Sequence, residues 1–334
     1  MKRVALTALS LLFTVQAFAV SEKDYSASFD AEVAPFYKTG KAGEFKGVGG
    51  VPIRYRMFVA EHEKGALVIV NGFTETYVKF AEVIYDLSRE GYSIYILDHR
   101  GQGFSGRMRK NPRMGYVRHF SEYVTDLKTF VDTVVNAQPH TRRFVLSHSM
   151  GGAITALYLA KYPKDFDAAA FSAPMHQINT SPYPEWMARF IANMSCGIGL
   201  GGNFAPGQGN HGLDGTFAVN RLTHSEVRYN KAVAVTKAFP EVGMGGASNR
   251  WVQQSLRATT AVYKNSPKIQ IPVLLLQASE DKLVKLPGQN EFCKRAQHCV
   301  KIPFPGAFHE LLQETDAIRD RVVEAVIAFF ASNQ

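Results

Sequence analysis

Short apolar runs alternate with amphipathic helical patterns along most of this chain, and that alternation limits its possible folds more than any other feature. The central runs are apolar on both faces, which is typical of parallel strands buried between two layers of helices. Residues 44–49 pair naturally with the first run as an antiparallel edge. The pattern predicts an α/β protein with a doubly wound, mostly parallel sheet. We expect strands at 53–60, 66–71, 92–98, 143–148, 168–173, 272–277 and 300–304, and helices at 77–90, 121–137, 150–162 and 310–332.

The alternation stops between residues 176 and 262, where no strand pattern occurs and residues 195–215 are rich in glycine. A segment of this length far exceeds an ordinary loop, although a long crossover is the simpler alternative. We interpret residues 176–262 as an inserted helical cap, or lid, on a core formed by residues 20–175 and 263–334. Helical pieces are expected within the cap at 184–194, 217–239 and 249–263.

The N-terminus has the pattern of an export signal. Two basic residues, Lys2 and Arg3, precede an apolar stretch that ends in Ala17-Phe18-Ala19. Small residues at the first and third positions of that triplet fit cleavage after Ala19. We therefore expect residues 1–19 to be a signal peptide and the protein to be periplasmic or secreted. The alternative is a membrane anchor formed by residues 4–20, which is short for a span of about 20 residues.

Charge and cysteine content exclude several classes of protein. The formal net charge is +9, but the densest basic run, 107–113, is too short to indicate nucleic-acid binding. A solvated basic surface explains this charge, and contact with an anionic lipid surface is the alternative. Cys293 and Cys299 could form a disulfide only if a helix ends between them. Together with His298 they still lack a fourth zinc ligand, and we expect no metal site.

Residues 143–152, RFVLSHSMGG, combine a strand, a serine and the start of a helix. Small residues beside Ser149 suit a sharp turn that lifts a serine hydroxyl out of the sheet, as in a nucleophile elbow. The start of the helix would supply a backbone N–H for an oxyanion. We predict Ser149 as a nucleophile; the alternative is a serine-rich turn that only caps a helix.

A serine nucleophile needs a base and an acid that orients the base, and in folds with this elbow the acid comes before the histidine. Asp281 follows a buried strand and is the favoured acid, with Glu280 as its competitor. His309 follows the last strand and is the favoured base. The other histidines after the serine are less well placed: His176, His211, His224 and His298.

The second oxyanion donor should come from the loop after the strand at 66–71. Gly72 permits close approach of the backbone, and the N–H of Phe73 would then point at the site beside that of Met150. The alternative for this loop is an ordinary turn between strand and helix.

Residues 101–106, GQGFSG, match a dinucleotide-binding motif. The residues that follow are basic, contain proline and are poor at starting a helix, which that motif requires. We therefore predict no nucleotide binding. The segment is better interpreted as a tight loop that supports the elbow, with Asp98 and Arg100 as structural polar anchors.

Several segments together resemble the α/β-hydrolase superfamily, and within it the monoacylglycerol lipases and bacterial lysophospholipases. They span about residues 70–315: NGFTETYVKFAEV, LDHRGQGFSGR, LSHSMGGAI, RWVQQSLRA, LLLQASEDKLV and PGAFHELLQE. The resemblance implies an α/β-hydrolase fold, a Ser149–Asp281–His309 triad and an oxyanion hole formed by the N–H groups of Phe73 and Met150. Two positions depart from the family pattern. Ser147 replaces a glycine, and Asn71 stands where related enzymes often have histidine.

The resemblance also implies an activity, a serine carboxylic ester hydrolase that releases fatty acid from a lysophospholipid. A monoacylglycerol lipase, a general carboxylesterase and a lipid transacylase are the alternatives. The expected partners are a small lipid ester and a lipid surface, with no nucleic acid, nucleotide, metal or cofactor. Apolar candidates for the acyl pocket lie at the start of the cap, where core packing is an equally good explanation: Met175, Trp186, Met187, Phe190 and Met194.

Overall fold

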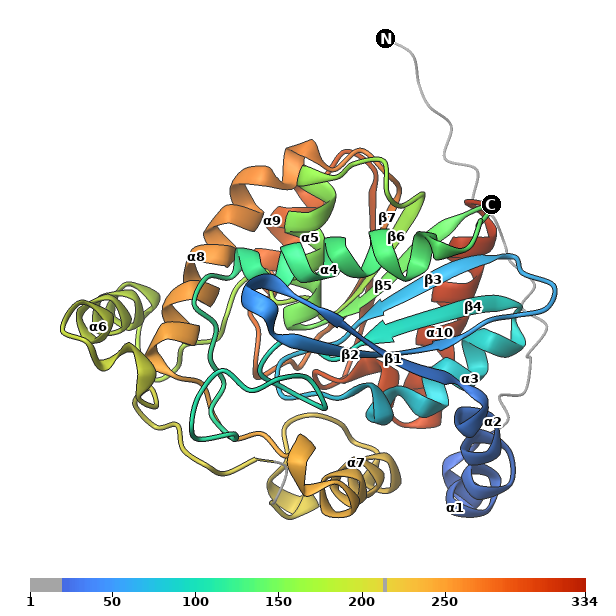
Figure 1. Ribbon diagram of the computed structural model, residues 1–334, viewed down its shortest axis with the longest axis horizontal. Coiled ribbons are helices and arrows are strands. Elements are labelled where there is room, and N and C mark those ends of the chain that lie inside the picture. The colour runs from blue at the N-terminus through green and yellow to red at the C-terminus, as the bar shows by residue number, and fades with distance from the viewer. Residues whose placement is uncertain (1–19, 213–214) are drawn as a thin grey trace, which may run out of the picture.

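The computed structural model describes residues 20–212 and 215–334. An eight-stranded sheet forms its centre, in the order β1-β2-β4-β3-β5-β6-β7-β8 (Figure 1). The β1–β2 and β2–β4 pairs are antiparallel and all other pairs are parallel. The strands are β1 (Lys41–Lys46), β2 (Pro52–Phe58), β3 (Gly65–Val70), β4 (Tyr92–Leu97), β5 (Arg143–His148), β6 (Ala168–Ser172), β7 (Val273–Ala278) and β8 (Cys299–Phe304). The predicted doubly wound, mostly parallel sheet is confirmed.

Helices cover both faces of this sheet. One face packs against α4 (Ser121–Thr133), α5 (Met150–Lys161), α8 (Asn249–Asn265) and α9 (Leu286–Arg295). The other face packs against α3 (Ala81–Arg89) and α10 (Asp316–Ala331). Successive side chains of a strand point to opposite faces, so both must be apolar when both are covered.

Strand β3 illustrates this requirement, because every one of its residues is buried. Val68 and Val70 pack into the core on the α5 side, whereas Leu67 and Ile69 pack into the core on the α3 side. Burying one such side chain contributes about 1.5–3 kcal/mol, and a polar residue at any of these positions would lose that contribution.

The predicted antiparallel edge is present, but it lies three residues earlier than expected. Strand β1 pairs with β2 from Lys41, opposite Met57, to Lys46, opposite Pro52. The residues expected to continue the strand form the turn instead, where Gly49 and Gly50 adopt φ values of 69° and 77°. Backbone of that kind favours glycine and ends a strand.

The N-terminal part of the described chain forms helical structure that the sequence analysis did not anticipate. Helices α1 (Tyr25–Ser28) and α2 (Ala34–Thr39) enclose a small apolar cluster that includes Tyr25, Phe29 and Val33 and packs on Ala81 of α3. The predicted signal peptide, residues 1–19, lies outside the described residues. Within the described ranges, no helix combines the length and apolar character needed to cross a membrane.

The inserted segment leaves the core after β6 and carries α6 (Glu185–Gly197), which packs against α8, and α7 (Glu226–Ala238); both lie at the margin of the molecule (Figure 1). The single helical piece expected at 217–239 is divided into a short turn, Phe217–Val219, and α7. Helix α8 packs against α5 and buries Trp251, Ala258 and Val262 in the core. The division of the chain at residues 176 and 262 therefore stays a prediction.

Two further local findings concern the C-terminal third. The last helix begins at Asp316 rather than at 310, because residues 310–315 form a short turn and a loop. Cys293 lies in α9 and Cys299 begins β8, and their sulfurs form a disulfide. Helix α9 ends at Arg295, between the two cysteines, which is the condition that the sequence set for this pairing.

Candidate active site

Ser149 occupies a sharp turn between β5 and α5. Its φ of 51° and ψ of −117° place it in a region that residues other than glycine rarely adopt. The turn brings backbones into close contact. A Cβ on Gly151 would lie 2.0 Å from the carbonyl oxygen of Val70, and one on Gly152 would lie 2.4 Å from Pro174 Cβ. Only glycine fits at these two positions, which explains the small residues that follow the serine.

Ser147 stands at the position where the family pattern has its first glycine. It is fully buried, and its hydroxyl lies 3.4 Å from the carbonyl oxygen of Ala170 on the neighbouring strand. A serine side chain is therefore accommodated here, with a weak hydrogen bond inside the sheet.

The structure brings together the three side chains that the sequence selected. His309 Nε2 lies 2.8 Å from Ser149 Oγ, and His309 Nδ1 lies 2.6 Å from Asp281 Oδ2. The second carboxylate oxygen of Asp281 accepts hydrogen bonds from the N–H groups of Leu283 and Val284. The side chain of Asp281 is buried, whereas its competitor Glu280 is exposed.

Electrostatics favour an ion pair between Asp281 and His309. Burial disfavours a charged His309, but the adjacent Asp281 carboxylate outweighs it, and the pKa of His309 is raised. Burial likewise opposes ionisation of Asp281, yet His309 and the two backbone N–H donors hold its pKa below the usual value. His309 therefore has a greater affinity for a proton than a free histidine.

The loop after β3 lies against the serine. A Cβ on Gly72 would be 3.1 Å from Ser149 Cβ, which leaves no room for a larger residue. The Gly72 N–H donates to the Glu75 carboxylate. Within the ranges the structure describes, neither the Phe73 N–H nor the Met150 N–H donates to another protein group. Met150 is the first residue of α5, where a helix N–H has no partner within the helix.

The GQGFSG segment supports this loop rather than the elbow itself. Gln102 Nε2 donates to the carbonyl oxygens of Gly72 and Glu75, at 2.7 and 3.0 Å. Asp98 is fully buried and accepts from the N–H of Tyr77 and of Phe104. No helix follows the segment before α4 begins at residue 121. This local structure differs from the strand–turn–helix that a dinucleotide motif needs.

Arg100, the second polar anchor predicted for this segment, is also buried. Its guanidinium binds both carboxylate oxygens of Asp126 and one oxygen of Glu122 on α4. Arg100 therefore binds α4, which covers one face of the sheet, and does not contact the serine.

The sequence analysis did not identify three buried charged residues that lie beside these side chains. Lys79 forms ion pairs with Glu75 and with Glu310, the residue after His309. Burial opposes ionisation of Glu75, but Lys79 and neighbouring donors lower its pKa to about 2. His148 lies 3.9 Å from Glu75, and burial lowers its pKa to about 4, so it is neutral at pH 7. No local sequence signal marks this cluster, because Lys79 and Glu310 are far apart in the chain.

A cavity of about 300 Å³ opens over Ser149 and His309. Of the five predicted pocket residues only Met175 lines it. On α6, Trp186, Phe190 and Met194 are 66%, 59% and 51% exposed, and Met187 is half-buried outside the cavity. Helix α6 packs against α8 at the margin of the molecule (Figure 1), and none of its residues lines the cavity.

Other apolar side chains line the cavity instead: Phe73, Ile178, Leu222, Trp251, Leu283 and Val284. The sequence analysis did not select the last five for the pocket, although Trp251 lies in the quoted segment RWVQQSLRA and Leu283 and Val284 lie in LLLQASEDKLV. A larger cavity of about 700 Å³ adjoins the first at Phe73, Thr74 and Leu222. The site thus places apolar side chains, together with several polar ones, beside a hydrogen-bonded serine.

An α/β sheet of this order, with a serine on the turn after β5, an acid after β7 and a histidine after β8, defines an α/β-hydrolase. Residues 61–316 match the family described as serine aminopeptidase, S33. The chain belongs to this family, and the protein is a serine hydrolase of the α/β-hydrolase fold.

Its relatives include lipid esterases. The chain is 37% identical over 318 residues to lysophospholipase L2 of Escherichia coli K12, covering 92% of this chain and 93% of that protein. It is 30% identical to a monoacylglycerol lipase of Mycolicibacterium smegmatis, over 81% of this chain and 91% of that protein. A carboxyl esterase of Bacillus coagulans has a similar structure, with a TM-score of 0.70, 16% identity, and coverage of 88% and 98%.

Proposed function

We propose that this serine hydrolase releases fatty acid from a lysophospholipid. Ser149 is the nucleophile, His309 the general base and Asp281 the acid that orients it. The observation that carries the proposal is the continuous row of hydrogen bonds from Asp281 through His309 to Ser149. The similarity to lysophospholipase L2 over nearly the whole chain supports the substrate class.

In this mechanism the Ser149 hydroxyl attacks the ester carbonyl while His309 Nε2 takes its proton. The carbonyl oxygen becomes an oxyanion, which accepts hydrogen bonds from the N–H groups of Phe73 and Met150. His309 then gives the proton to the departing alcohol, which leaves an acyl group on Ser149. A water molecule, deprotonated by His309, hydrolyses this ester and restores the enzyme. No metal or cofactor takes part.

The acyl chain would lie against the apolar side chains of the cavity beside the serine. Met175 keeps its predicted role, and we assign the remaining wall to Ile178, Leu222 and Trp251 in place of the residues on α6. Substitution of Leu222 by tryptophan is expected to shorten the preferred acyl chain, because Leu222 lines both cavities.

Fatty-acid release from a substrate panel tests the activity. The panel contains lysophosphatidylcholine, lysophosphatidylethanolamine, monoacylglycerol, short p-nitrophenyl esters and an aminoacyl anilide. Preference for the lysophospholipids, abolished in Ser149→Ala and kept in the matched variant Ser147→Ala, is the expected result. Preference for monoacylglycerol, for short esters or for the anilide would overturn the substrate class. Acyl transfer to a lipid alcohol in place of water would identify a transacylase.

Helix α6 presents an apolar surface that suits a lipid interface. Trp186, Phe190 and Met194 follow one another every four residues, which places them on one face, and all are exposed. Ile198, the residue after the helix, is also exposed. A helix with an exposed apolar face can lie in the interfacial region of a bilayer. We propose that this face contacts the membrane that supplies the substrate.

Tryptophan fluorescence tests the membrane contact, because Trp186 is exposed and Trp251, the other tryptophan, is 6% exposed. Vesicles of phosphatidylethanolamine and phosphatidylglycerol should shift the emission to shorter wavelength. Phe190→Ser should weaken the shift. Val59→Ser, an equally apolar exposed position in the loop after β2, should leave it unchanged. An unchanged spectrum with vesicles would rule the contact out.

We also propose that residues 1–19 direct export and are removed. The Cys293–Cys299 disulfide supports this proposal, because disulfides persist in oxidising compartments. Mass spectrometry of the mature protein from fractionated cells is expected to show Val20 as the first residue. A full-length chain in the membrane fraction would favour an anchor at residues 4–20.

A further inference from the structure

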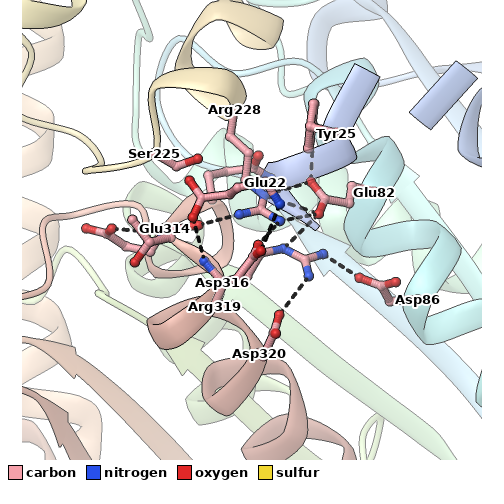
Figure 2. Close-up of polar contacts among 12 residues, drawn as sticks. Glu22, Tyr25, Glu82, Asp86, Ser225, Arg228, Glu314, Asp316, Arg319 and Asp320 are labelled. Atoms are coloured by element: carbon pink, nitrogen blue, oxygen red, sulfur yellow. Dashed lines mark hydrogen bonds and ion pairs between the residues drawn. The ribbon is translucent and has the colours of Figure 1, made fainter. Parts of the chain in front are cut away.

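A group of buried charges lies where α3, α7, α10 and the loop after His309 meet (Figure 2). The mechanism above uses none of them. Glu314 is fully buried at the edge of this group, five residues after His309. A buried carboxylate is costly unless each oxygen is hydrogen-bonded, so its partners indicate what it holds in place.

The Glu314 carboxylate closes the loop that carries the catalytic histidine. Oε1 accepts from the backbone N–H of Phe308, the residue before His309, at 2.8 Å. Oε2 accepts from the N–H of Thr315 at 3.1 Å. The two bonds join both ends of the segment 308–315, so the backbone on either side of His309 is held by one side chain.

The same carboxylate binds the inserted segment. Oε1 lies 3.0 Å from His224 Nδ1, and Oε2 accepts from the His224 N–H at 3.1 Å. The His224 ring also stacks on Phe308, with 3.8 Å between ring centres. All four hydrogen bonds to the Glu314 carboxylate therefore fix either the His309 loop or His224, whose ring touches that loop.

Backbone contacts extend this connection into the cavity. The Glu310 N–H donates to the carbonyl oxygen of Leu222, whose side chain lines the cavity over Ser149. The Thr223 hydroxyl donates to the carbonyl oxygen of Gln313 at 2.6 Å. Residues 222–224 are thus joined to the His309 loop along its length.

Arg228 on α7 anchors the other end of this segment. It is buried, donates to the Glu314 carbonyl oxygen at 2.8 Å and forms ion pairs with Glu82 of α3 and Asp316 of α10 (Figure 2). Replacing one partner of such a buried pair leaves an uncompensated charge. The segment 222–228 is therefore held to the core at both ends.

We propose that Glu314 is a positioning residue for His309, and that residues 222–228 are a fixed wall of the active site rather than part of a cap that moves. This proposal rests on the proposed role of His309. Glu314 holds the loop in the conformation that lets His309 reach Ser149 and Asp281 together. A shift of the loop by about 1 Å costs about 100-fold in rate.

The decisive variant is Glu314→Gln, because an amide has only one oxygen to accept hydrogen bonds. We expect kcat to fall about 100-fold with KM within twofold, since the Glu310 N–H still holds the Leu222 carbonyl and keeps this cavity wall in place. The acidic limb of the kcat/KM profile should move to lower pH, because a displaced His309 loses the Asp281 carboxylate. Glu61→Gln, the same exchange at an exposed position in the loop after β2, is the control and should match the unmodified enzyme.

Urea unfolding separates positioning from a general loss of stability. If Glu314→Gln does not fold, Thr223→Val removes one bond to the same loop and should lower kcat with the same shift in pH profile. A folded Glu314→Gln with unchanged kcat and pH profile would overturn the proposal. Activity that survives in Ser149→Ala would instead overturn the proposed mechanism, so the two failures are distinguishable.

Discussion

The ammonium of Lys79 lies 2.8 Å from the Glu75 carboxylate. The same ammonium pairs with Glu310, so one lysine connects the loop that carries Phe73 to the loop that carries His309. Phe73 and His309, the proposed oxyanion donor and base, belong to segments more than 200 residues apart, and these buried charges join the two loops that carry them.

Lys79→Met is expected to leave two buried carboxylates without their counter-ion. Breaking a buried pair in this way costs about 3–5 kcal/mol in the free energy of unfolding. Urea denaturation measures the loss. Lys128→Met removes a half-exposed pair with Asp132, which is worth about 0–1 kcal/mol. Equal losses in the two variants would contradict the role assigned to Lys79.

The pH dependence of activity should reflect the raised pKa of His309. Only a neutral imidazole can take the serine proton, so kcat/KM falls as pH drops through that pKa, which lies above the value of about 6.5 for free histidine. Asp281→Asn removes the carboxylate that raises it. We expect its acidic limb at lower pH and a fall in kcat of about 10⁴-fold. The same limb in both enzymes would show that Asp281 does not act on His309.

Gly151→Ala tests the close packing of the elbow. The added Cβ would lie 2.0 Å from the Val70 oxygen and 2.6 Å from the Asn71 oxygen, both backbone atoms. We expect a loss of about 1–3 kcal/mol in the free energy of unfolding, together with lower kcat. Gly197→Ala is the control, because nothing lies within 4 Å of its added Cβ. A Gly151→Ala enzyme as stable and active as the control would disprove the contact.

His176 should make the protein sensitive to acid. It is buried against Phe171 and Phe292, and burial lowers its pKa to about 3. The unfolded chain binds a proton below about pH 6.5 whereas the folded chain does not, so acidification favours unfolding from pH 6.5 down to about 3. Between pH 8 and pH 5 this group costs about 2 kcal/mol.

His176→Phe should remove that cost. Urea unfolding at pH 8 and pH 5 measures the difference, and the variant should lose less stability on acidification than the unmodified protein. His62→Phe makes the same exchange at an exposed position and should leave the pH dependence unchanged. Parallel losses in all three proteins would assign the acid sensitivity to other groups.

Most of the fold and the three central side chains could be predicted because their signals are local. A buried strand must be apolar on both faces, and a serine elbow needs small residues beside it, as Gly151 and Gly152 confirm. Asp281 and His309 each follow a strand, and parallel strands bring their carboxyl ends to one edge. Each of these residues could therefore be selected from the residues next to it in the chain.

The acyl pocket could not be predicted in the same way. The apolar residues of α6 repeat every four positions, and that spacing is identical for a helix that packs on a core and for one that faces solvent. Only the path of the chain after β6 decides that Trp186 is exposed while Leu222 reaches the cavity. The expectation failed because a hydrophobic stripe does not specify what covers it.

The pattern of residues along the chain was thus enough to predict the alternating strands and helices, the elbow at Ser149 and the order of the proposed acid and base. Tertiary structure alone decided the partners of Lys79, Arg228 and Glu314, and the direction in which α6 points. The physical reason is the distance along the chain over which each interaction acts. Backbone sterics and apolar periodicity act between neighbouring residues, whereas a buried charge is stabilised by whichever opposite charge the completed fold brings within about 4 Å.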